Sequence, residues 1–199
     1  MVVVGITGGI GSGKTTVSGF FKELGIPVYI ADVEAKLLMN TDKQLQQEII
    51  NLLGKEAYVD GVLNRPFIAS KVFNSKKMLS SLNAIVHPAV RKHFEEWVSA
   101  QKAPYVMQEA AILFENGGYK LCDFTILITA PIKERISRTI KRDGTTENEV
   151  IKRMKAQWSD DRKAAMADVV IENIILEDAK KAVARIHTHI MVRIGKGWT

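Results

Sequence analysis

The sequence predicts an α/β fold, an open, doubly wound parallel sheet of five strands. Short segments with continuous apolar character recur along the chain, and stretches with helical periodicity separate them. Such strands are typical of a parallel sheet that helices cover on both faces. The 199 residues, of which 46% are hydrophobic, are enough to bury a core without disulfides or structural metals.

The five strands are predicted at Val2–Ile6, Pro27–Ile30, Tyr105–Gln108, Phe124–Ile128 and Val169–Ile171. Apolar residues at positions i, i+3, i+4 and i+7 predict a helix after the first strand, and Gly25 ends it. The same spacing from Ala179 to Ile194 predicts a packed terminal helix.

The region between the second and third strands is too long for a simple connection. It holds about 70 residues with helical periodicity and no good strand, whereas a parallel crossover needs only about a dozen. We therefore predict a helical insertion at about 60–100, in which Pro88 kinks or restarts the long helix. Without repeats or low-complexity linkers, the chain is expected to form one domain over 1–199, with the insertion embedded in it.

Composition excludes several classes of protein. A single cysteine, Cys122, rules out an internal disulfide framework and a cysteine-rich metal site. The longest uncharged apolar run, Phe124–Ile132, is far shorter than the ~20 residues that span a bilayer. No basic segment precedes the first apolar run, as it would in a signal peptide. The sequence therefore predicts a cytoplasmic protein that does not bind membranes.

The net charge of +6 is unevenly distributed. Residues 133–155 hold eight basic and four acidic side chains, a surplus of four positive charges. The whole segment 101–199 has the same surplus, with 17 basic and 13 acidic side chains. A nucleic-acid binder would spread its basic residues along a face, so no nucleic-acid partner is expected. A local cluster suits a small polyanion, and a solvated helix face is the alternative.

Residues Gly8–Thr15 match the pattern G-x-x-x-x-G-K-[ST] of a phosphate-binding loop. The match follows an apolar strand and opens a helix, as such a loop does, whereas a merely flexible glycine turn has no need of that context. Backbone N–H groups can point at a phosphate where glycine leaves room, Lys14 would reach the β- and γ-phosphates, and Thr15 would bind Mg²⁺. The predicted ATP-binding residues of this segment are Gly9, Gly11, Ser12, Gly13, Lys14, Thr15 and Thr16.

The remaining motifs favour a small-molecule kinase among phosphate-loop proteins. The chain has neither the N-K-x-D motif of regulatory GTPases nor the L-S-G-G-Q signature of ABC-type ATPases. Its small size and the basic stretch suit an enzyme with a lid that brings arginines to the phosphates and excludes water. We expect this lid at 138–155, with Arg138 and Arg142 completing the ATP site.

At this point the sequence resembles the dephospho-coenzyme A kinase family, nearly from end to end. The loop Ile6–Lys14 is similar to that of the family, and ordered segments follow it along the chain. They are Ala31-Asp32, Leu63-Asn64-Arg65, Leu82-Asn83, His87-Pro88, Ile112–Glu115, Ala130-Pro131, Arg138, Arg142-Asp143-Gly144, Arg153, Gln157, Ala167-Asp168 and Asn173.

The resemblance implies a fold of P-loop kinase type and transfer of the ATP γ-phosphoryl group, with Mg²⁺, to the ribose 3′-hydroxyl of dephospho-coenzyme A. Asp32, Lys14 and Arg142 would be catalytic. Asp32 would accept the hydroxyl proton, and a helix N-cap is its alternative role. The residues expected to bind the acceptor are Asp32, Arg65, His87, Arg91 and Glu109.

Several of these roles have alternatives. Arg91 suits a surface ion pair equally well, and His87 a structural place beside Pro88. Glu109 would support Mg²⁺, orient Lys14, or be a buried structural carboxylate. This sequence departs from the family at three positions, where Ile30, Ala69 and Glu109 replace the more usual Asp, Arg and Asp.

Two other functions compete with this interpretation. One is another small P-loop kinase, acting on a nucleoside monophosphate, a sugar or a shikimate-like acceptor. The other is a nucleotide-dependent binding protein or a nucleic-acid-associated protein. The sequence leaves the oligomeric state open.

Overall fold

The computed structural model describes residues 1–73 and 75–198. The chain divides into two compact units, of which the first combines Met1–Ile30 with Gln101–Thr199 and the second is Ala31–Ala100. The sequence-based estimate of 60–100 for the insertion covers the C-terminal part of the second unit. Within the described ranges, no helix is both long enough and apolar enough to cross a bilayer.

The first unit is built on a five-stranded sheet in which every pair of neighbouring strands is parallel. The strand order is β2-β5-β1-β6-β7. The strands are β1 (Val2–Gly8), β2 (Val28–Ile30), β5 (Tyr105–Glu109), β6 (Phe124–Thr129) and β7 (Val169–Glu172). The predicted parallel sheet is therefore confirmed, and each of the five predicted strands is present.

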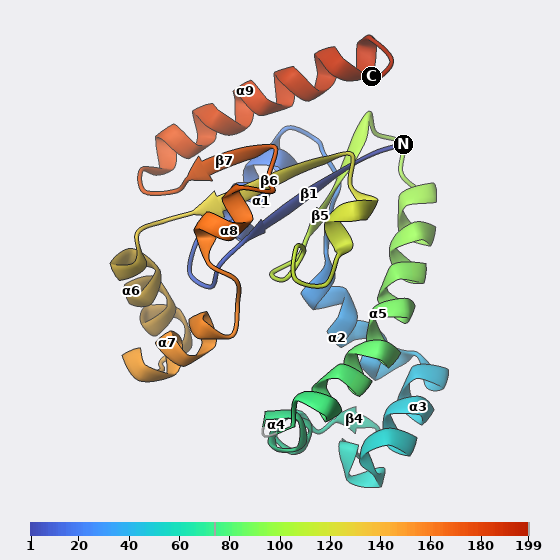
Figure 1. Ribbon diagram of the computed structural model, residues 1–199. Helices are drawn as coiled ribbons and strands as arrows, with labels where there is room; N and C mark the ends of the chain where they lie inside the picture. Colours follow the sequence, from blue (N-terminus) through green and yellow to red (C-terminus); the bar gives the residue numbers. More distant parts are fainter. Residues whose placement is uncertain (74, 199) are drawn as a thin grey trace. The chain divides into compact units, whose positions relative to one another are not determined.

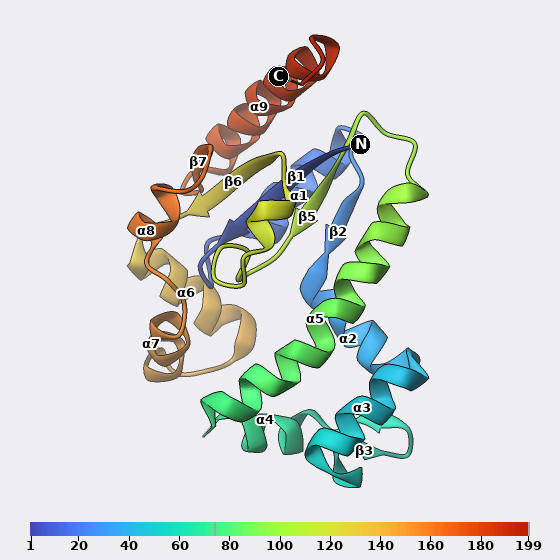
Figure 2. The same ribbon diagram turned by 45° about the vertical axis from the view of Figure 1, so that its right-hand side comes forward.

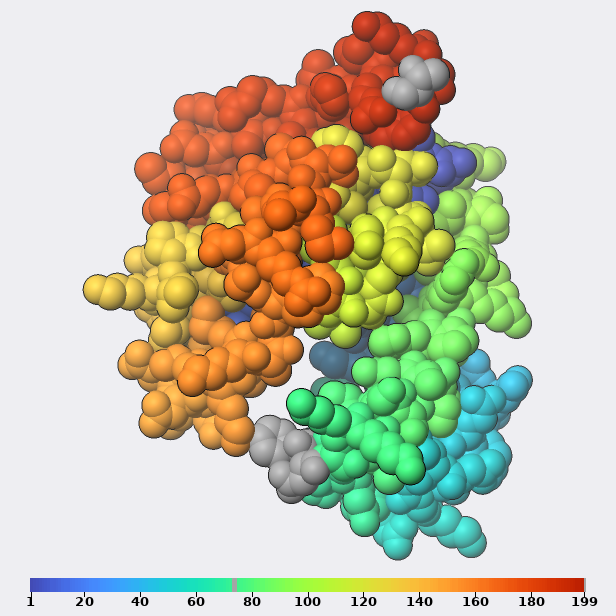
Figure 3. Space-filling view, viewed as in Figure 1, coloured from blue at the N-terminus to red at the C-terminus, as the bar shows by residue number. Residues whose placement is uncertain are grey.

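Helices cover both faces of this sheet (Figure 1). The helices of the first unit are α1 (Lys14–Glu23), η2 (Gly118–Leu121), α6 (Ile132–Asp143), α7 (Glu147–Lys155), α8 (Asp160–Ala164) and α9 (Leu176–Gly195). Helices α1 and α9 pack against one face, and α8 and η2 lie over the other (Figures 1 and 2). The terminal helix α9 was predicted, and its outer surface forms one side of this unit (Figure 3).

The main core lies between the sheet and the pair α1 and α9. It contains Ile6 of β1, Phe21 of α1, Ile126 of β6 and Val183 of α9, each at most 1% exposed. Burial of apolar surface stabilises a fold by about 25 cal/mol for each Å² that is removed from water. This core fixes β1 and α1, and with them the loop that joins them.

The second unit is mostly helical, as predicted. Its elements are α2 (Ala31–Thr41), α3 (Lys43–Leu53), η1 (Lys55–Ala57), β3 (Tyr58–Val59), β4 (Val62–Leu63), α4 (Arg65–Phe73) and α5 (Lys76–Ser99). It has its own core, in which Leu45 and Ile49 of α3 pack with Leu82 and Val86 of α5. Asp42 caps α3 by accepting hydrogen bonds from the N–H groups of Gln44 and Leu45.

One expectation for this unit is wrong in detail. A short antiparallel hairpin, β3–β4, is present where no strand was predicted. Its turn residues Asp60 and Gly61 have φ of 50° and 78°, as a two-residue turn of the Asp-Gly type requires. Of the two effects predicted for Pro88, a kink or a restart, the restart does not occur: α5 continues through the proline and bends along its length (Figure 2). Buried residues on both sides of the proline, Val86 and Phe94, offset the hydrogen bond that proline removes.

Candidate active site around the phosphate-binding loop

The predicted phosphate-binding loop lies between β1, which ends at Gly8, and α1, which begins at Lys14. Gly11 and Gly13 have φ of 78° and 86°, a left-handed conformation that residues with a Cβ rarely adopt. The N–H of Ser12 donates to the carbonyl of Gly9 at 3.1 Å, which closes a turn within the loop. A loop of this kind followed by a helix N-terminus presents backbone donors and a positive dipole to an anion.

The glycines also leave room for neighbouring residues on the outer side of the loop, a role that was not predicted from the sequence. A Cβ on Gly9 would meet the guanidinium of Arg135, and a Cβ on Gly11 would meet the backbone carbonyl of the same residue. A Cβ on Gly13 would meet the side-chain amide of Asn173. The missing side chains therefore let α6 and the segment after β7 approach the loop closely.

Lys14 and Thr15 occupy the start of α1, as the motif requires. The Lys14 Nζ donates to the carbonyl oxygen of Gly8 at 2.9 Å, so its side chain folds back along the loop. Thr15 is exposed and donates from Oγ1 to Oε1 of Glu109 at 2.9 Å. Ser18, one turn further along α1, donates to Oε2 of Glu109 at 2.7 Å.

Glu109 is thus a buried carboxylate, 5% exposed, at the carboxyl end of β5. Its partner in register on β1 is Ile6, which lies just before the loop. Both of its oxygens accept hydrogen bonds from α1. The structure thus places Glu109 beside Thr15.

The donor set fits a magnesium ion that arrives with a nucleotide. Mg²⁺ prefers oxygen ligands, and at nucleotide sites it keeps several waters and takes most other ligands from the phosphates. Thr15 offers an exposed hydroxyl, and Glu109 a carboxylate directly behind it. Among the residues described, no group of three His, Cys, Asp or Glu side chains is arranged to hold a metal ion.

The two arginines predicted for the lid lie at different distances from the loop. Arg138 donates from a terminal nitrogen to the carbonyl of Asn173 at 2.9 Å, and the same nitrogen would lie 3.9 Å from a Cβ on Gly13. Arg142, one turn later on α6, pairs with Asp143 at 2.6 Å, which Arg153 of α7 approaches at 3.0 Å. The hydrogen bond from Arg142, assisted by Arg153, lowers the pKa of Asp143 to about 2. The structure thus brings Arg138, but not Arg142, to the loop.

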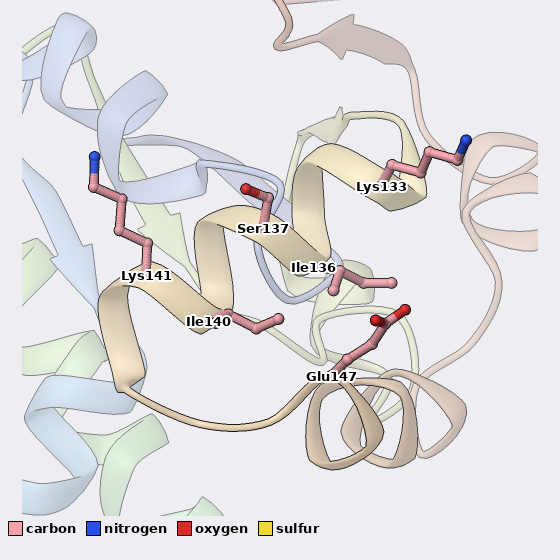
Figure 4. Close-up of a pocket in the computed structure, with 6 residues that line it drawn as sticks. All are labelled: Lys133, Ile136, Ser137, Ile140, Lys141 and Glu147. Atoms are coloured by element: carbon pink, nitrogen blue, oxygen red, sulfur yellow. The ribbon is translucent and has the colours of Figure 1, made fainter.

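A hollow of about 580 Å³ lies along α6 where it faces α7, away from the phosphate-binding loop (Figure 4). Ile136 and Ile140 of α6 line it, together with Glu147 of α7. Figure 4 shows that Lys133 and Lys141 extend in opposite directions from α6. These cations do not converge, so the hollow lacks the features of a phosphate site.

The predicted acceptor residues, apart from Glu109, belong to the second unit. Asp32 is exposed in the first turn of α2, which begins at Ala31, so it is not the N-cap residue of that helix. Arg65 is the exposed first residue of α4. Arg91 pairs with Glu95 at 3.0 Å on the surface of α5, the alternative that the sequence left open. Partial desolvation of the His87 ring on α5 lowers the pKa of its imidazole.

Three residues that contact the loop were not assigned to the site from the sequence. Arg135 donates to the carbonyl of Ile10 at 2.9 Å, and Gln157 accepts from the N–H of Ile10 at the same distance. Asn173 donates to the carbonyl of Ser12, also at 2.9 Å. Gln157 and Asn173 belong to the C-terminal pattern that resembles the family, and that pattern was the available signal. Nothing in the local sequence distinguishes Arg135 from the other basic residues of α6.

The chain is similar to known proteins over most of its length. The family model described as dephospho-CoA kinase matches residues 2–178. A dephospho-CoA kinase of Bacteroides fragilis is 37% identical over 173 residues, which are 86% of this chain and 84% of the relative. A crystal structure from Thermus thermophilus superposes with a TM-score of 0.85 at 36% identity, covering 94% of this chain and 97% of that one. A shikimate kinase from Bacteroides thetaiotaomicron, at 14% identity and a TM-score of 0.54 over 96% and 98% of the two chains, shares the fold.

Proposed function

The chain belongs to the dephospho-CoA kinase family, whose members use ATP, and on this premise we propose that it phosphorylates the ribose 3′-hydroxyl of dephospho-coenzyme A to give coenzyme A. The observation that carries the proposal is the loop from Gly8 to Thr15 with Glu109 buried behind it. That arrangement suits the triphosphate of ATP with a magnesium ion.

The first unit would hold ATP. Backbone N–H groups of the loop bind the β- and γ-phosphates, and the Lys14 ammonium moves from the Gly8 carbonyl to the transferring phosphoryl group. Arg138 lies beside Gly13 and would contact the phosphates directly. Arg142 would join them once it leaves Asp143.

Thr15 would hold Mg²⁺ through its hydroxyl, and Glu109 would orient that hydroxyl from behind. When bound, the ion neutralises charge that develops on the phosphate oxygens. Glu109 itself keeps its two hydrogen bonds to α1, so the start of the helix is held in place before the nucleotide arrives.

The acceptor would bind Asp32 and other residues of the second unit. Asp32 follows the end of β2 by two residues, and open α/β sheets bind their ligands beyond the carboxyl ends of the strands. In the transfer, the 3′-oxygen forms a bond to the γ-phosphorus, the bond to the β,γ-bridging oxygen breaks, and the hydroxyl proton passes to the Asp32 carboxylate. Arg65 and His87 would bind the acceptor, with Arg91 doing so only after it leaves Glu95.

The proposal is tested with ATP, Mg²⁺ and a panel of acceptors. We expect ADP release with dephospho-coenzyme A, confirmed by the mass of the product, and none with a nucleoside monophosphate, shikimate or gluconate. Transfer to one of those acceptors in place of dephospho-coenzyme A would refute the assignment. Lys14→Ala should lower kcat by about 10²-fold or more, because it removes a donor to the transition state. Near-normal turnover of a folded Lys14→Ala protein would contradict the role of the loop.

A further inference from the structure

Two residues that flank the predicted lid, one on each side of it in the sequence, bind one residue of the phosphate-binding loop. Arg135 lies on α6, three residues before the lid at 138–155 begins, and its Nε donates to the carbonyl of Ile10 at 2.9 Å. Gln157 lies two residues after the lid ends, and its Oε1 accepts from the N–H of Ile10 at 2.9 Å. The two polar backbone groups of Ile10 are therefore held by side chains that lie up to 147 residues away in the sequence.

The Arg135 side chain is buried and has two hydrogen-bond partners. Its side chain is only 7% exposed, and a terminal guanidinium nitrogen donates to Oδ2 of Asp160 at 2.7 Å while Nε holds Ile10. Gly9 leaves the space that the guanidinium fills. A lysine has a single donor group at the end of its chain, so it cannot make both contacts in this geometry.

The Gln157 contact fixes the direction of a peptide group. Its amide nitrogen lies 3.5 Å from the carbonyl of Ala111, so the two ends of the amide have different partners and its oxygen faces Ile10. The N–H of Ile10 is therefore held by Gln157 and is not left for a phosphate. We expect other N–H groups of the loop to bind the phosphate.

We propose that Arg135 and Gln157 are positioning residues that hold the Gly9–Ile10 segment in its ATP-binding conformation and connect it to both ends of the lid. Neither residue needs to touch the nucleotide. If only a fraction of molecules has a competent loop, the apparent dissociation constant for ATP rises in inverse proportion to that fraction. The loss therefore falls on nucleotide affinity and leaves acceptor affinity unchanged.

The test compares four variants by the affinity of a non-hydrolysable ATP analogue with Mg²⁺. We expect Arg135→Gln and Gln157→Leu each to weaken analogue binding by about tenfold or more, and to leave the KM for dephospho-coenzyme A within about twofold of the original. Arg135→Lys keeps the charge and serves if Arg135→Gln does not fold. It should weaken analogue binding as well, because one contact is lost. Ile190→Ala is the control, since Ile190 is fully buried in α9 and far along the chain from the loop.

Thermal unfolding of each variant separates positioning from stability. The control should lower the unfolding temperature but bind the analogue normally at 25 °C. Equal analogue affinity in the control, the Arg135 variants and Gln157→Leu would overturn the proposal, as would a rise in the KM for dephospho-coenzyme A as large as the loss of analogue affinity. Because the main measurement is nucleotide binding, it does not depend on which acceptor the enzyme uses.

Discussion

Replacement of Glu109 separates its structural role from its chemical one. Glu109→Gln keeps the shape of the side chain and an acceptor oxygen, but removes the negative charge next to Thr15. Glu109→Ala removes both hydrogen bonds from α1. Ser18→Ala removes the 2.7 Å bond to Glu109 and the longer bond, 3.2 Å, from the same hydroxyl to the carbonyl of Thr15. It leaves the charge of Glu109 and its contact with the Thr15 hydroxyl in place, so it is the matched control.

The magnitudes follow from the burial of each partner. A hydrogen bond to a charged group contributes about 1.5–3 kcal/mol. Ser18 is 1% exposed, so in Glu109→Ala its hydroxyl loses the charged acceptor without gaining water and keeps only the 3.2 Å bond to the carbonyl of Thr15, whereas the exposed Thr15 can be hydrated. With the cavity added, we expect Glu109→Ala to cost about 3 kcal/mol of unfolding free energy, and Glu109→Gln only about 1 kcal/mol. Ser18→Ala should cost about 2 kcal/mol.

Activity should follow a different order. If the carboxylate supports the magnesium ion through Thr15, Glu109→Gln should lower kcat by about 10²-fold, as does the loss of one preorganised electrostatic contact. Ser18→Ala should keep kcat within a few fold despite its lower stability. Urea unfolding gives the free energies, and a coupled ADP assay over a range of Mg²⁺ concentrations gives kcat. Near-normal kcat for Glu109→Gln at every Mg²⁺ concentration would show that Glu109 is only a structural carboxylate.

Three further predictions concern the acceptor side and the single cysteine. Asp32→Asn should fold and bind ATP normally but lower kcat by about 10²–10⁴-fold, since an amide cannot take the hydroxyl proton, and recovery at high Mg²⁺ would contradict a role as base. Arg65→Ala should raise the KM for dephospho-coenzyme A far more than the KM for ATP, and equal rises in steady-state assays would place the acceptor elsewhere. Burial, assisted by Asp123, raises the pKa of Cys122 to about 12, so at pH 8.5 the thiol is almost wholly protonated. Iodoacetamide should then alkylate the native protein at least about tenfold more slowly than the urea-unfolded chain, and equal rates would refute the shift.

The strands and the loop were predictable because their signals are local. Each strand is a short apolar run, and the phosphate-binding motif lies within the eight consecutive residues Gly8–Thr15. The hairpin between Tyr58 and Leu63 had such a signal as well, in Asp60-Gly61, but the helical periodicity around it hid the turn.

The supports of the loop were not predictable in the same way. Ile10 meets Gln157 and Arg135, and Ser12 meets Asn173, only after the sheet has formed. The resemblance to a family included Gln157 and Asn173, but it assigned no role to either residue. Their hydrogen bonds depend on tertiary packing, which no periodicity or spacing encodes.

The discontinuity of the first unit has a consequence for synthesis on the ribosome. Strand β1 is made first, yet Val2 pairs with Tyr105 and Val4 with Phe124, so both neighbours of β1 emerge more than a hundred residues later. The second unit, Ala31–Ala100, is continuous and carries its own core of Leu45, Ile49 and Leu82. It can therefore assemble while the nascent chain still lacks most of the sheet. Long-range parallel pairing is slow, so β1 and the phosphate-binding loop stay without their neighbours in the sheet at least until β5 and β6 have been synthesised.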